Sequence, residues 1–360
     1  MKILVVHASA GAGHRKAAEA VYNGLRSTTA HNVTLADVLD YTSPSYRDSY
    51  RASYVFLVTK MSWAWGLFFT VTDLPWLRPL IRVIRRALNS INAKPFEQLL
   101  IKEKYDAIIS THFFSGEVAA ALKRKGRISS KIICVVTDFD AHSIWLAKGI
   151  DCYTGACDFT RDKLIQLGVE KDKIFVTGIP TDKKFAAAVN KGELQKKLGL
   201  KGGIFTILIA TGSFGMGPIK EIVTELKGYQ VMVVCGNNKA LYAQLSPIQS
   251  DLVKIHGLVN NMDELMSVSD LMITKPGGLS IAEALVKGLP LIFFSPIPGQ
   301  ETNNIKVLNS YGIGISDENI LKIAAEVKRL STSNENLNIA KKNIQLLARP
   351  SAAPDIIKLI

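Results

Sequence analysis

The sequence predicts an α/β protein built from two Rossmann-like, doubly wound domains. Short apolar runs rich in β-branched residues alternate with helical patterns along most of the 360 residues, which is typical of βαβ units and parallel sheets. Two glycine-bearing loops follow apolar runs in corresponding places, GAGH after residues 2–7 and ATGSFGMG after residues 204–210. Each loop resembles the first βα turn of such a domain, so two domains are expected to face each other across a cleft.

The boundary between the two domains is predicted at residues 183–203. This stretch is polar and lysine-rich and ends in paired glycines, as linkers often do. It separates an N-terminal domain, 1–182, from a C-terminal domain, 204–335. The remaining helices, 336–360, could pack on either domain.

Composition and charge narrow the classes of partner. The formal net charge of +13 predicts an acidic partner, either nucleic acid, anionic lipid headgroups or a phosphorylated substrate. The four cysteines lack CxxC spacing, so neither a zinc site nor a disulfide framework is indicated. The apolar N-terminal run is too short for a signal peptide and reads as a first strand. A reducing, cytoplasmic setting is therefore expected.

Residues 41–90 break the alternation, because they mix aromatic residues with arginines and lack strand-turn punctuation. We interpret this segment as a pair of helices lying in a membrane interface. Its aromatic side chains would enter the lipid boundary: Trp63, Trp65, Phe68, Phe69 and Trp76. Its arginines would meet anionic headgroups, each cation contributing roughly 1 kcal/mol near the surface: Arg78, Arg82, Arg85 and Arg86.

Two other interpretations of the segment stay open. Residues 52–71 are apolar enough to raise a transmembrane helix, but Lys60 and two serines interrupt a run that needs about 20 apolar residues. The aromatic residues could instead form the core of a long helical insert. Because aromatic residues and cations lie side by side in one segment, the interpretation as helices in a membrane interface is favoured over the other two. We therefore expect a peripheral membrane protein without a membrane span.

The run ITKPGGLSIAEALVKGLPLIFFSPIPGQETNN indicates a nucleotide-sugar site. Lys275 can supply charge to an anion, and Gly277 and Gly278 can adopt φ > 0 and let a phosphate approach the N–H groups of a helix start. Glu283, two turns further on, suits the two hydroxyls of a ribose. A second set follows with acceptors and amides that read sugar hydroxyls: Gln300, Glu301, Asn303 and Asn304.

Several polar residues follow strand ends in the N-terminal half. His14 stands near the first turn of the helix after GAGH, where Gly13 helps to shape the loop. Such a histidine also suits a helix cap or an anion contact. Asp138 and His142, in VVTDFDAHSIW, come just after another strand, and His112 ends a third. A cap or a loop hydrogen bond is an equally good interpretation of Asp138.

Four stretches carry a resemblance to a known family: TKPGGLSIAEALVKGLPLIFFSPIPGQETNN, VHASAGAGHRKAAEAV, VVTDFDAHSIW and HGLVNNMDELM. Together they resemble the monogalactosyldiacylglycerol synthase and processive diacylglycerol glucosyltransferase family, relatives of MurG in glycosyltransferase family 28. The resemblance implies the GT-B fold and an inverting enzyme that moves galactose or glucose from a UDP-sugar to diacylglycerol at the face of a membrane.

The resemblance also implies roles for individual residues. Glu283 would bind the ribose, Gln300 and Glu301 the hexose, and the backbone of Val259 the uracil edge. Met262 and Leu265 would pack near the uracil, although a core position suits them better. The following residues would surround the diphosphate: Ser213, Phe214, Thr274, Lys275, Gly277, Gly278 and Leu279.

On the acceptor side, the family pattern makes His14 the favoured catalytic base, with Asp138 and His142 as rivals. An imidazole of near-neutral pKa suits the removal of a proton from the attacking hydroxyl. The helix start and Lys275 would stabilise the UDP leaving group, so we expect neither a metal nor a prosthetic group. The sequence departs from the family at Lys60, which no proline follows, so the acceptor lipid and the hexose stay open.

Other activities remain as alternatives. A MurG-like N-acetylglucosaminyl transferase acting on a polyprenyl-diphosphate lipid would be expected to have a more glycine-rich loop than GAGH. A nucleotide-sugar 2-epimerase would need no segment like 41–90. Nucleic-acid binding is disfavoured, because no RRM, KH or helix-turn-helix pattern occurs and the arginines cluster with tryptophans.

Overall fold

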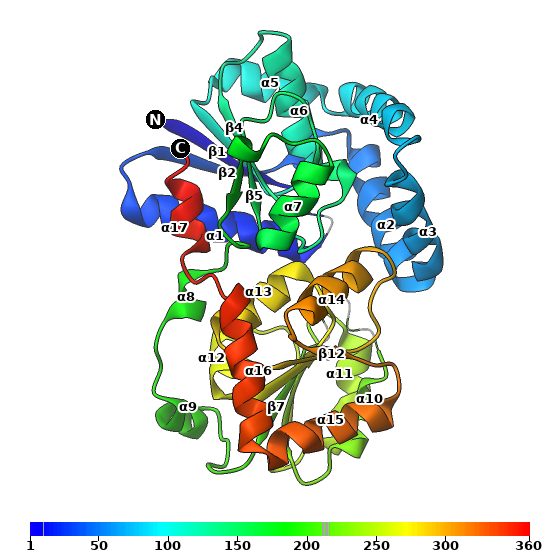
Figure 1. Ribbon diagram of the computed structural model, residues 1–360, viewed down its shortest axis with the longest axis vertical. Helices are drawn as coiled ribbons and strands as arrows, with labels where there is room; N and C mark the ends of the chain where they lie inside the picture. The colour runs from blue at the N-terminus through cyan, green and yellow to red at the C-terminus, as the bar shows by residue number, and fades with distance from the viewer. Residues whose placement is uncertain (10, 211, 213–214, 216) are drawn as a thin grey trace. The chain divides into compact units, whose positions relative to one another are not determined.

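The predicted α/β class is confirmed, because the chain forms two parallel six-stranded sheets covered by helices (Figure 1). The structure, a computed structural model, describes residues 1–9, 11–210, 212, 215 and 217–360. The chain divides into two units. Unit 1 comprises Met1–Lys183, Ile297–Gln300 and Arg349–Ile360, and unit 2 comprises Lys184–Pro296 and Glu301–Ala348.

The sheet of unit 1 has the strand order β2-β1-β3-β4-β5-β6, with every pair parallel. Its strands are β1 (Lys2–His7), β2 (Asn32–Asp37), β3 (Ala107–Ser110), β4 (Lys131–Val135), β5 (Cys152–Gly155) and β6 (Ile174–Val176). The chain runs outward from β1 in one direction to β2 and in the other to β3. The carboxyl ends of β1 and β3 therefore flank the point where ligands of such sheets bind.

Alternate residues of these strands fill two separate cores. Leu4, Val6 and Ile108 pack on one face of the sheet, whereas Ile3 and Val5 pack on the other. The strands are apolar on both faces because helices cover both, as expected for a parallel sheet.

The helices of unit 1 include one that returns from the end of the chain. They are α1 (Ala12–Thr28), α2 (Pro44–Lys60), α3 (Ser62–Thr72), α4 (Arg78–Asn92), α5 (Lys94–Glu103), α6 (Phe113–Arg124), α7 (Asp158–Gln166) and α17 (Ala352–Ile357). Helix α17 lies beside α1 (Figure 1), where Ile356 is fully buried in the same core as Val21 and Leu25.

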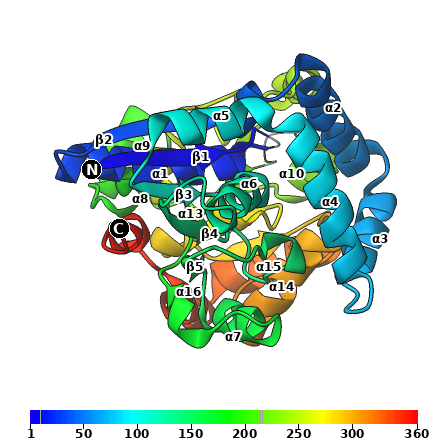
Figure 2. The ribbon, with the colours of Figure 1, turned by 90° about the horizontal axis from the view of Figure 1, so that it is seen from above.

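The segment predicted to be an interfacial helix pair forms three helices instead, α2, α3 and α4, along one edge of unit 1 (Figure 2). Helix α2 begins at Pro44 behind Ser43, whose hydroxyl accepts a hydrogen bond from the backbone N–H of Tyr46 at 3.3 Å. No single helix among the described residues has the length and hydropathy of a membrane span. Only α2 and α3 taken together meet those criteria, and they are bent by 111° at the break.

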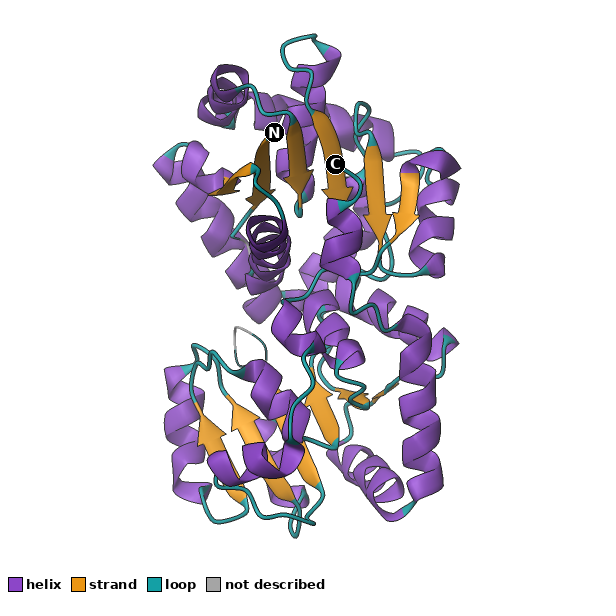
Figure 3. Cartoon of the chain, turned by 90° about the vertical axis from the view of Figure 1, so that its left-hand side faces the viewer, coloured by secondary structure: helices purple, strands orange, loops and turns teal. Residues whose placement is uncertain are grey.

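Unit 2 repeats the architecture of unit 1 (Figure 3), with the strand order β12-β11-β10-β7-β8-β9 and all pairs parallel. Its strands are β7 (Thr206–Ala210), β8 (Gln230–Val234), β9 (Val253–His256), β10 (Leu271–Thr274), β11 (Leu291–Phe293) and β12 (Ile315–Ser316). The chain runs outward from β7 in one direction to β8 and β9 and in the other to β10, β11 and β12. The carboxyl ends of β7 and β10 therefore flank the second position where ligands of such sheets bind.

The helices of unit 2 include two in the segment predicted to be a linker, 183–203. They are α8 (Lys183–Ala186, of which Lys183 belongs to unit 1), α9 (Lys191–Lys197), α10 (Ile219–Glu225), α11 (Lys239–Leu245), α12 (Met262–Val268), α13 (Gly278–Val286), α14 (Gln300–Ser310, of which Gln300 belongs to unit 1), α15 (Ile320–Thr332) and α16 (Asn334–Leu347). Helix α13 starts directly after β10 and the Lys-Pro-Gly-Gly turn.

Candidate functional site

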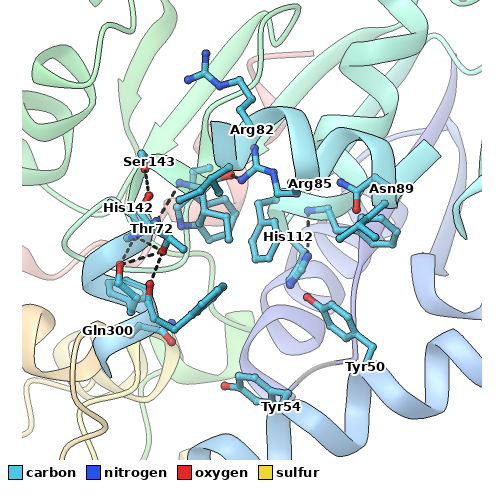
Figure 4. Close-up of a pocket in the computed structure, with 18 of the residues that line it drawn as sticks. Tyr50, Tyr54, Thr72, Arg82, Arg85, Asn89, His112, His142, Ser143 and Gln300 are labelled. Atoms are coloured by element: carbon cyan, nitrogen blue, oxygen red, sulfur yellow. Dashed lines mark hydrogen bonds between the residues drawn. The ribbon is translucent and has the colours of Figure 1, made fainter. Parts of the chain in front are cut away.

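Unit 1 contains a cavity of about 530 Å³ between α2, α3, α4 and the carboxyl ends of its strands (Figure 4). Most of its wall is apolar or aromatic. The aromatic residues that line it are Tyr46, Tyr50, Tyr54, Trp65, Phe68, Phe69, Phe113, Phe114 and Trp145. Four of the polar residues singled out in the sequence open onto the same cavity: His14, His112, Asp138 and His142.

His14 is held in one tautomer by backbone and side-chain contacts. It lies in the first turn of α1, next to Gly13, and its Nδ1 is 2.8 Å from the carbonyl oxygen of Thr111. The hydroxyl of Thr137 lies 3.0 Å from the same nitrogen. Because a carbonyl oxygen can only accept, Nδ1 carries the proton, and the lone pair of the neutral ring is on Nε2.

The near-neutral pKa expected for His14 is corrected, because its pKa lies well below neutrality. Burial lowers its pKa to about 4, although the hydrogen bond to Thr111 acts in the opposite direction. The ring is therefore neutral at physiological pH and can accept a proton at Nε2. His112 packs edge-on against it, with ring centroids 4.8 Å apart.

The other two histidines of the cavity serve as local braces. His112 begins α6, and its Nδ1 accepts a hydrogen bond from the backbone N–H of Phe114 at 3.2 Å. His142 donates from Nε2 to the carbonyl oxygen of Phe69 at 2.8 Å and accepts at Nδ1 from the N–H of Ile144 at 3.0 Å. Both ring nitrogens of His142 are therefore engaged, which makes it a poorer base than His14.

Asp138 lies in the loop after β4 and is buried. Its Oδ1 accepts a hydrogen bond from Nε2 of Gln300 at 2.7 Å, within unit 1. Gln300 was expected to read the hexose, and in this arrangement its amide nitrogen is committed to Asp138. The second N–H of this amide and its carbonyl oxygen are the groups that a sugar-reading role for Gln300 would use.

The buried histidines should make unit 1 sensitive to mild acid. Burial lowers the pKa of His7, His14, His112 and His142 below the ordinary value of 6.5. The unfolded chain therefore binds more protons below pH 6.5, so stability falls as pH falls from there towards the folded-state values. We expect urea unfolding to show a loss of about 2 kcal/mol or more between pH 7 and pH 5.

One variant isolates this contribution. His142→Gln should lose less stability over that pH interval than the wild type, whereas the control His31→Gln should match it. Equal losses in all three proteins would contradict the assignment of acid sensitivity to the buried histidines.

The aromatic residues expected at the membrane divide into two groups. Trp63, Phe68 and Trp76 have exposed fractions of 66%, 53% and 74%. Trp65 and Phe69 are half-buried and turn inward. Phe69 packs closely over Gly299, whose φ of +85° and proximity to the ring leave no space for a Cβ, so the expectation that Phe69 and Trp65 enter lipid is corrected.

The expectation that Arg85 meets lipid headgroups is also corrected. Its guanidinium points inward and pairs with the buried carboxylate of Glu117, with Nε 2.7 Å from Oε2. Arg86 is half-buried and lies 3.7 Å from the same carboxylate. Arg82 also lines the cavity, and its side chain points away from Arg85 in Figure 4.

In unit 2, four of the predicted donor-site residues gather at the carboxyl end of β10. Lys275 is buried, and its Nζ lies 3.9 Å from Oε2 of Glu301, also buried. Burial lowers the pKa of Lys275, and the charge of Glu301 opposes that effect. A Cβ added to Gly277 would come 3.9 Å from Oε1 of Glu301. Asn304 donates from Nδ2 to the carbonyl oxygen of Pro276 at 3.1 Å.

One detail of the donor-site prediction is corrected, and two of the predicted residues have hydrogen-bond partners within the protein. The Lys-Pro-Gly-Gly turn does not use φ > 0, because Gly277 has φ −73° and Gly278 begins α13 with ordinary helical geometry. The hydroxyl of Thr274 donates to the carbonyl oxygen of Ala210 at 2.9 Å, so it joins β10 to β7. Asn304 is buried and braces the turn. Helix α13 nevertheless starts without a side-chain cap, so its first N–H groups suit an anion.

The remaining donor-site residues are placed as follows. Glu283 and Leu279 lie on α13 and are half-buried, as is Val259 in the loop before α12. Leu265 is buried in unit 2, which supports its interpretation as a core residue. Ser213 and Phe214 lie outside the described residues. In the described parts of the chain, no three His, Cys, Asp or Glu side chains come together as a metal site would require.

Sequence reasoning missed Glu117, Thr111 and Thr137. A signal for Glu117 was present, because it shares the helical spacing of the apolar residues Phe114, Val118 and Ala121. An acidic residue on such a stripe indicates a buried, paired carboxylate. Nothing in the local sequence marks the carbonyl of Thr111 as the partner of His14, which is 97 residues away.

Two parallel doubly wound sheets, each with a glycine-bearing loop at its switch point, define a protein of the GT-B class. Solved structures agree in fold over essentially the whole chain. MurG from Acinetobacter baumannii has a TM-score of 0.62 at 14% identity, covering 100% of this chain and 99% of that one. Anabaena HepE in complex with UDP-glucose has a TM-score of 0.59 at 14% identity, covering 100% of this chain and 99% of that one. A UDP-GlcNAc 2-epimerase from Neisseria meningitidis has a TM-score of 0.63 at 14% identity, again covering 100% of this chain and 99% of that one.

Comparison of sequences identifies the family. Residues 14–181 match the family model for monogalactosyldiacylglycerol (MGDG) synthase, and residues 206–360 match the glycosyltransferase family 28 C-terminal domain. The processive diacylglycerol beta-glucosyltransferase of Bacillus pumilus is 30% identical over 364 residues, covering 99% of this chain and 94% of the relative. The enzyme of the same name from Bacillus licheniformis is 30% identical over 352 residues, covering 96% of this chain and 90% of the relative. The chain belongs to this family of diacylglycerol glycosyltransferases, as the sequence motifs predicted.

Proposed function

We propose that the protein transfers glucose from UDP-glucose to diacylglycerol at the surface of a membrane and inverts the anomeric configuration. The observation that carries the proposal is the cavity of unit 1, where a neutral histidine opens onto an apolar chamber. An apolar chamber suits the acyl chains of a lipid, and the histidine suits its hydroxyl. The relatives named as beta-glucosyltransferases support glucose over galactose.

The proposed reaction uses residues of both units. Nε2 of His14 removes the proton from the diacylglycerol hydroxyl as the oxygen attacks the anomeric carbon. The bond between that carbon and the UDP oxygen breaks on the opposite face, so the product is inverted. The carbonyl of Thr111 stabilises the imidazolium formed on His14 by accepting from Nδ1. The proton then passes to solvent.

The departing UDP carries negative charge, and unit 2 supplies groups to meet it. The uncapped N-terminus of α13 offers backbone N–H groups, and Lys275 offers a cation nearby. We propose that these suffice without a metal. Glu283 is assigned to the ribose and Glu301 to the hexose, as the family pattern implies.

Membrane binding is assigned to an outer face formed by α3, α4 and the turn between them, which we define by the exposed apolar residues that do not line the cavity: Trp63, Leu67, Trp76, Leu80, Val83 and Ile91. Each has more than half of its side chain exposed. An exposed patch of this kind marks an interaction site. Arg82, beside it, suits anionic headgroups, whereas Arg78 pairs with Asp73 and lines the cavity. We place the protein peripherally on the cytoplasmic face of the membrane.

Changing two residues of this outer face should release the protein from membranes. We expect Trp63→Ser combined with Trp76→Ser to weaken flotation with anionic vesicles by more than tenfold, because two large apolar side chains no longer enter the interface. Thermal stability should not change, since both side chains are exposed. The matched control replaces Leu258 and Leu346, exposed in unit 2, with serine. Equal vesicle binding in both double variants would refute this assignment.

The activity itself is tested by a matrix of donors and acceptors. Purified protein is incubated with UDP-glucose, UDP-galactose or UDP-N-acetylglucosamine, each with diacylglycerol or a polyprenyl diphosphate in mixed micelles. We expect a glucosylated diacylglycerol, with a larger yield when anionic lipid is present. No glycolipid from diacylglycerol with any donor would overturn the proposal. Product only on polyprenyl diphosphate, or epimerised donor without acceptor, would assign one of the alternative activities.

A further inference from the structure

Helix α4 is attached to unit 1 in an unusual way. Among its residues whose burial the structure describes, only Asn89 is less than a tenth exposed. The apolar side chains of α4 are mostly exposed, either on the outer face or along the cavity. A surface helix is normally held by an apolar stripe buried against the core, so α4 needs another anchor.

That anchor is the carboxylate of Glu117 on α6, which is 3% exposed. Arg85 donates to it twice, from Nε to Oε2 at 2.7 Å and from Nη2 to Oε1 at 3.1 Å. Asn89, one turn further along α4, donates from Nδ2 to Oε2 at 2.7 Å. Arg85 also donates from Nη1 to the carbonyl oxygen of Ile144 at 2.8 Å. One buried acid thus fixes two successive turns of α4.

The residues fixed in this way are part of the cavity wall. Arg85 and Asn89 both line the cavity, together with Ile81 and Leu88 of the same helix. Figure 4 shows Arg85 and Asn89 side by side at the edge of the cavity, on the side opposite Gln300. Helix α4 therefore has one side on the cavity and its outer face on the surface assigned to the membrane.

A helix that is held by a buried charge can be moved outward at a lower free-energy cost than a helix that is held by an apolar core. A buried carboxylate that loses its partners within the protein is strongly unfavourable, so the closed arrangement is well defined. If α4 moves outward, however, water reaches Glu117 and restores its solvation, while the apolar outer face is stabilised by lipid. Little apolar core is exposed by the movement, because α4 buries almost none.

We infer that Glu117 is a positioning residue that holds α4 closed over the cavity, and that α4 is the movable wall through which the acceptor lipid enters. This inference rests on the proposed function, since it assumes a lipid acceptor. In the membrane-bound protein the outer face of α4 is stabilised in lipid and the wall opens towards the bilayer. In the absence of a membrane the contact with Glu117 keeps the wall closed.

The test compares the wild type with Glu117→Gln, which keeps the shape of the side chain and removes its charge. Hydrogen exchange of a peptide covering 78–92 should be at least tenfold faster in the variant, without vesicles, while that of 131–135 is unchanged. Glu326→Gln, which removes a surface ion pair with Arg329 in unit 2, is the control and should leave both peptides unchanged.

A second readout separates a movable wall from a merely structural contact. The wild type should use long-chain diacylglycerol in vesicles far better than monomeric dioctanoylglycerol in water, because only the membrane opens α4. Glu117→Gln should reduce this preference at least fivefold. If both rates fall in parallel and the preference is unchanged, or if exchange in 78–92 is unaltered, the inference is overturned.

Two further controls complete the design. Asn89→Ala removes one of the three bonds and should shift both readouts in the same direction by a smaller amount, which keeps the test valid if Glu117→Gln folds poorly. Failure of the wild type to glycosylate either diacylglycerol would refute the proposed function. An active wild type with unchanged preference in both variants refutes only the role of Glu117 and α4.

Discussion

Replacement of His14 by asparagine should reduce kcat by roughly 10² to 10⁴-fold, the usual contribution of a general base. Asparagine can place its amide nitrogen where Nδ1 of His14 donates to the carbonyl of Thr111, but it has no basic lone pair. The fold of the first turn of α1 should therefore survive while proton removal is lost. Steady-state turnover with UDP-glucose and diacylglycerol measures the effect.

The pH dependence of the wild type should carry the signature of this histidine. Because burial lowers the pKa of His14 to about 4, its base form is populated at every pH well above that value. The acid limb of kcat/KM should therefore lie near pH 4 instead of near 6.5, once the activity at each pH is corrected for the fraction of protein that stays folded. An acid limb near 6.5 would contradict the buried, neutral ring.

Comparison with Asp138 decides between the two candidate bases. Asp138→Asn keeps an oxygen acceptor for Gln300 and should retain substantially more turnover than His14→Asn. If His14→Asn kept most of its activity while Asp138→Asn lost it, Asp138 would be the base. Binding of UDP, which involves unit 2, should be unaffected in both variants.

Replacement of Lys275 by methionine should lower kcat by about 10² to 10³-fold, as for the loss of one group that stabilises charge in a transition state. Lys275 is the buried cation beside the uncapped start of α13, and methionine keeps most of its volume. The effect should fall on kcat more than on the KM for UDP-glucose, because the UDP oxygen gains charge as its bond breaks.

Lys287→Met provides the matched control for this prediction. Lys287 caps the opposite end of α13, is half-buried, and has a pKa that is also lowered by burial. Its replacement should change turnover less than threefold. A Lys275→Met variant that retains more than a tenth of wild-type kcat would show that the leaving group is stabilised elsewhere.

The fold was predictable because parallel sheets are apolar on both faces. In runs such as Lys2–His7 and Thr206–Ala210, apolar residues follow one another without alternating with polar ones. This pattern distinguishes them from strands that have one face exposed to solvent. The glycine-bearing loops marked the first strand of each sheet. The apolar runs and the glycine-bearing loops are short stretches of sequence, so they can be recognised in a single sequence.

The candidate site was predictable only in part. His14, Asp138 and His142 were found because each follows a strand end, and strand ends of one parallel sheet converge. Their different states depend on distant partners such as Thr111 and Phe69, which no local pattern encodes. Arg85 was assigned to lipid for the same reason, since its partner Glu117 is 32 residues away. The segment 44–92 was predicted as two helices and forms three, because the break at Met61 between α2 and α3 carries no glycine or proline that would mark it.

The return of helix α17 to unit 1 has a consequence for biosynthesis. The core on one face of the sheet that begins at Lys2 is completed by Ile356 of α17, which is buried in the same cluster as Val21 and Leu25. A nascent chain therefore carries an unfinished N-terminal core while all of unit 2 is being translated. Domains usually fold in the order in which they emerge from the ribosome. Here unit 2, which ends at Ala348, can finish folding first, while Val21 and Leu25 of α1 lack part of their core until residue 356 is synthesised.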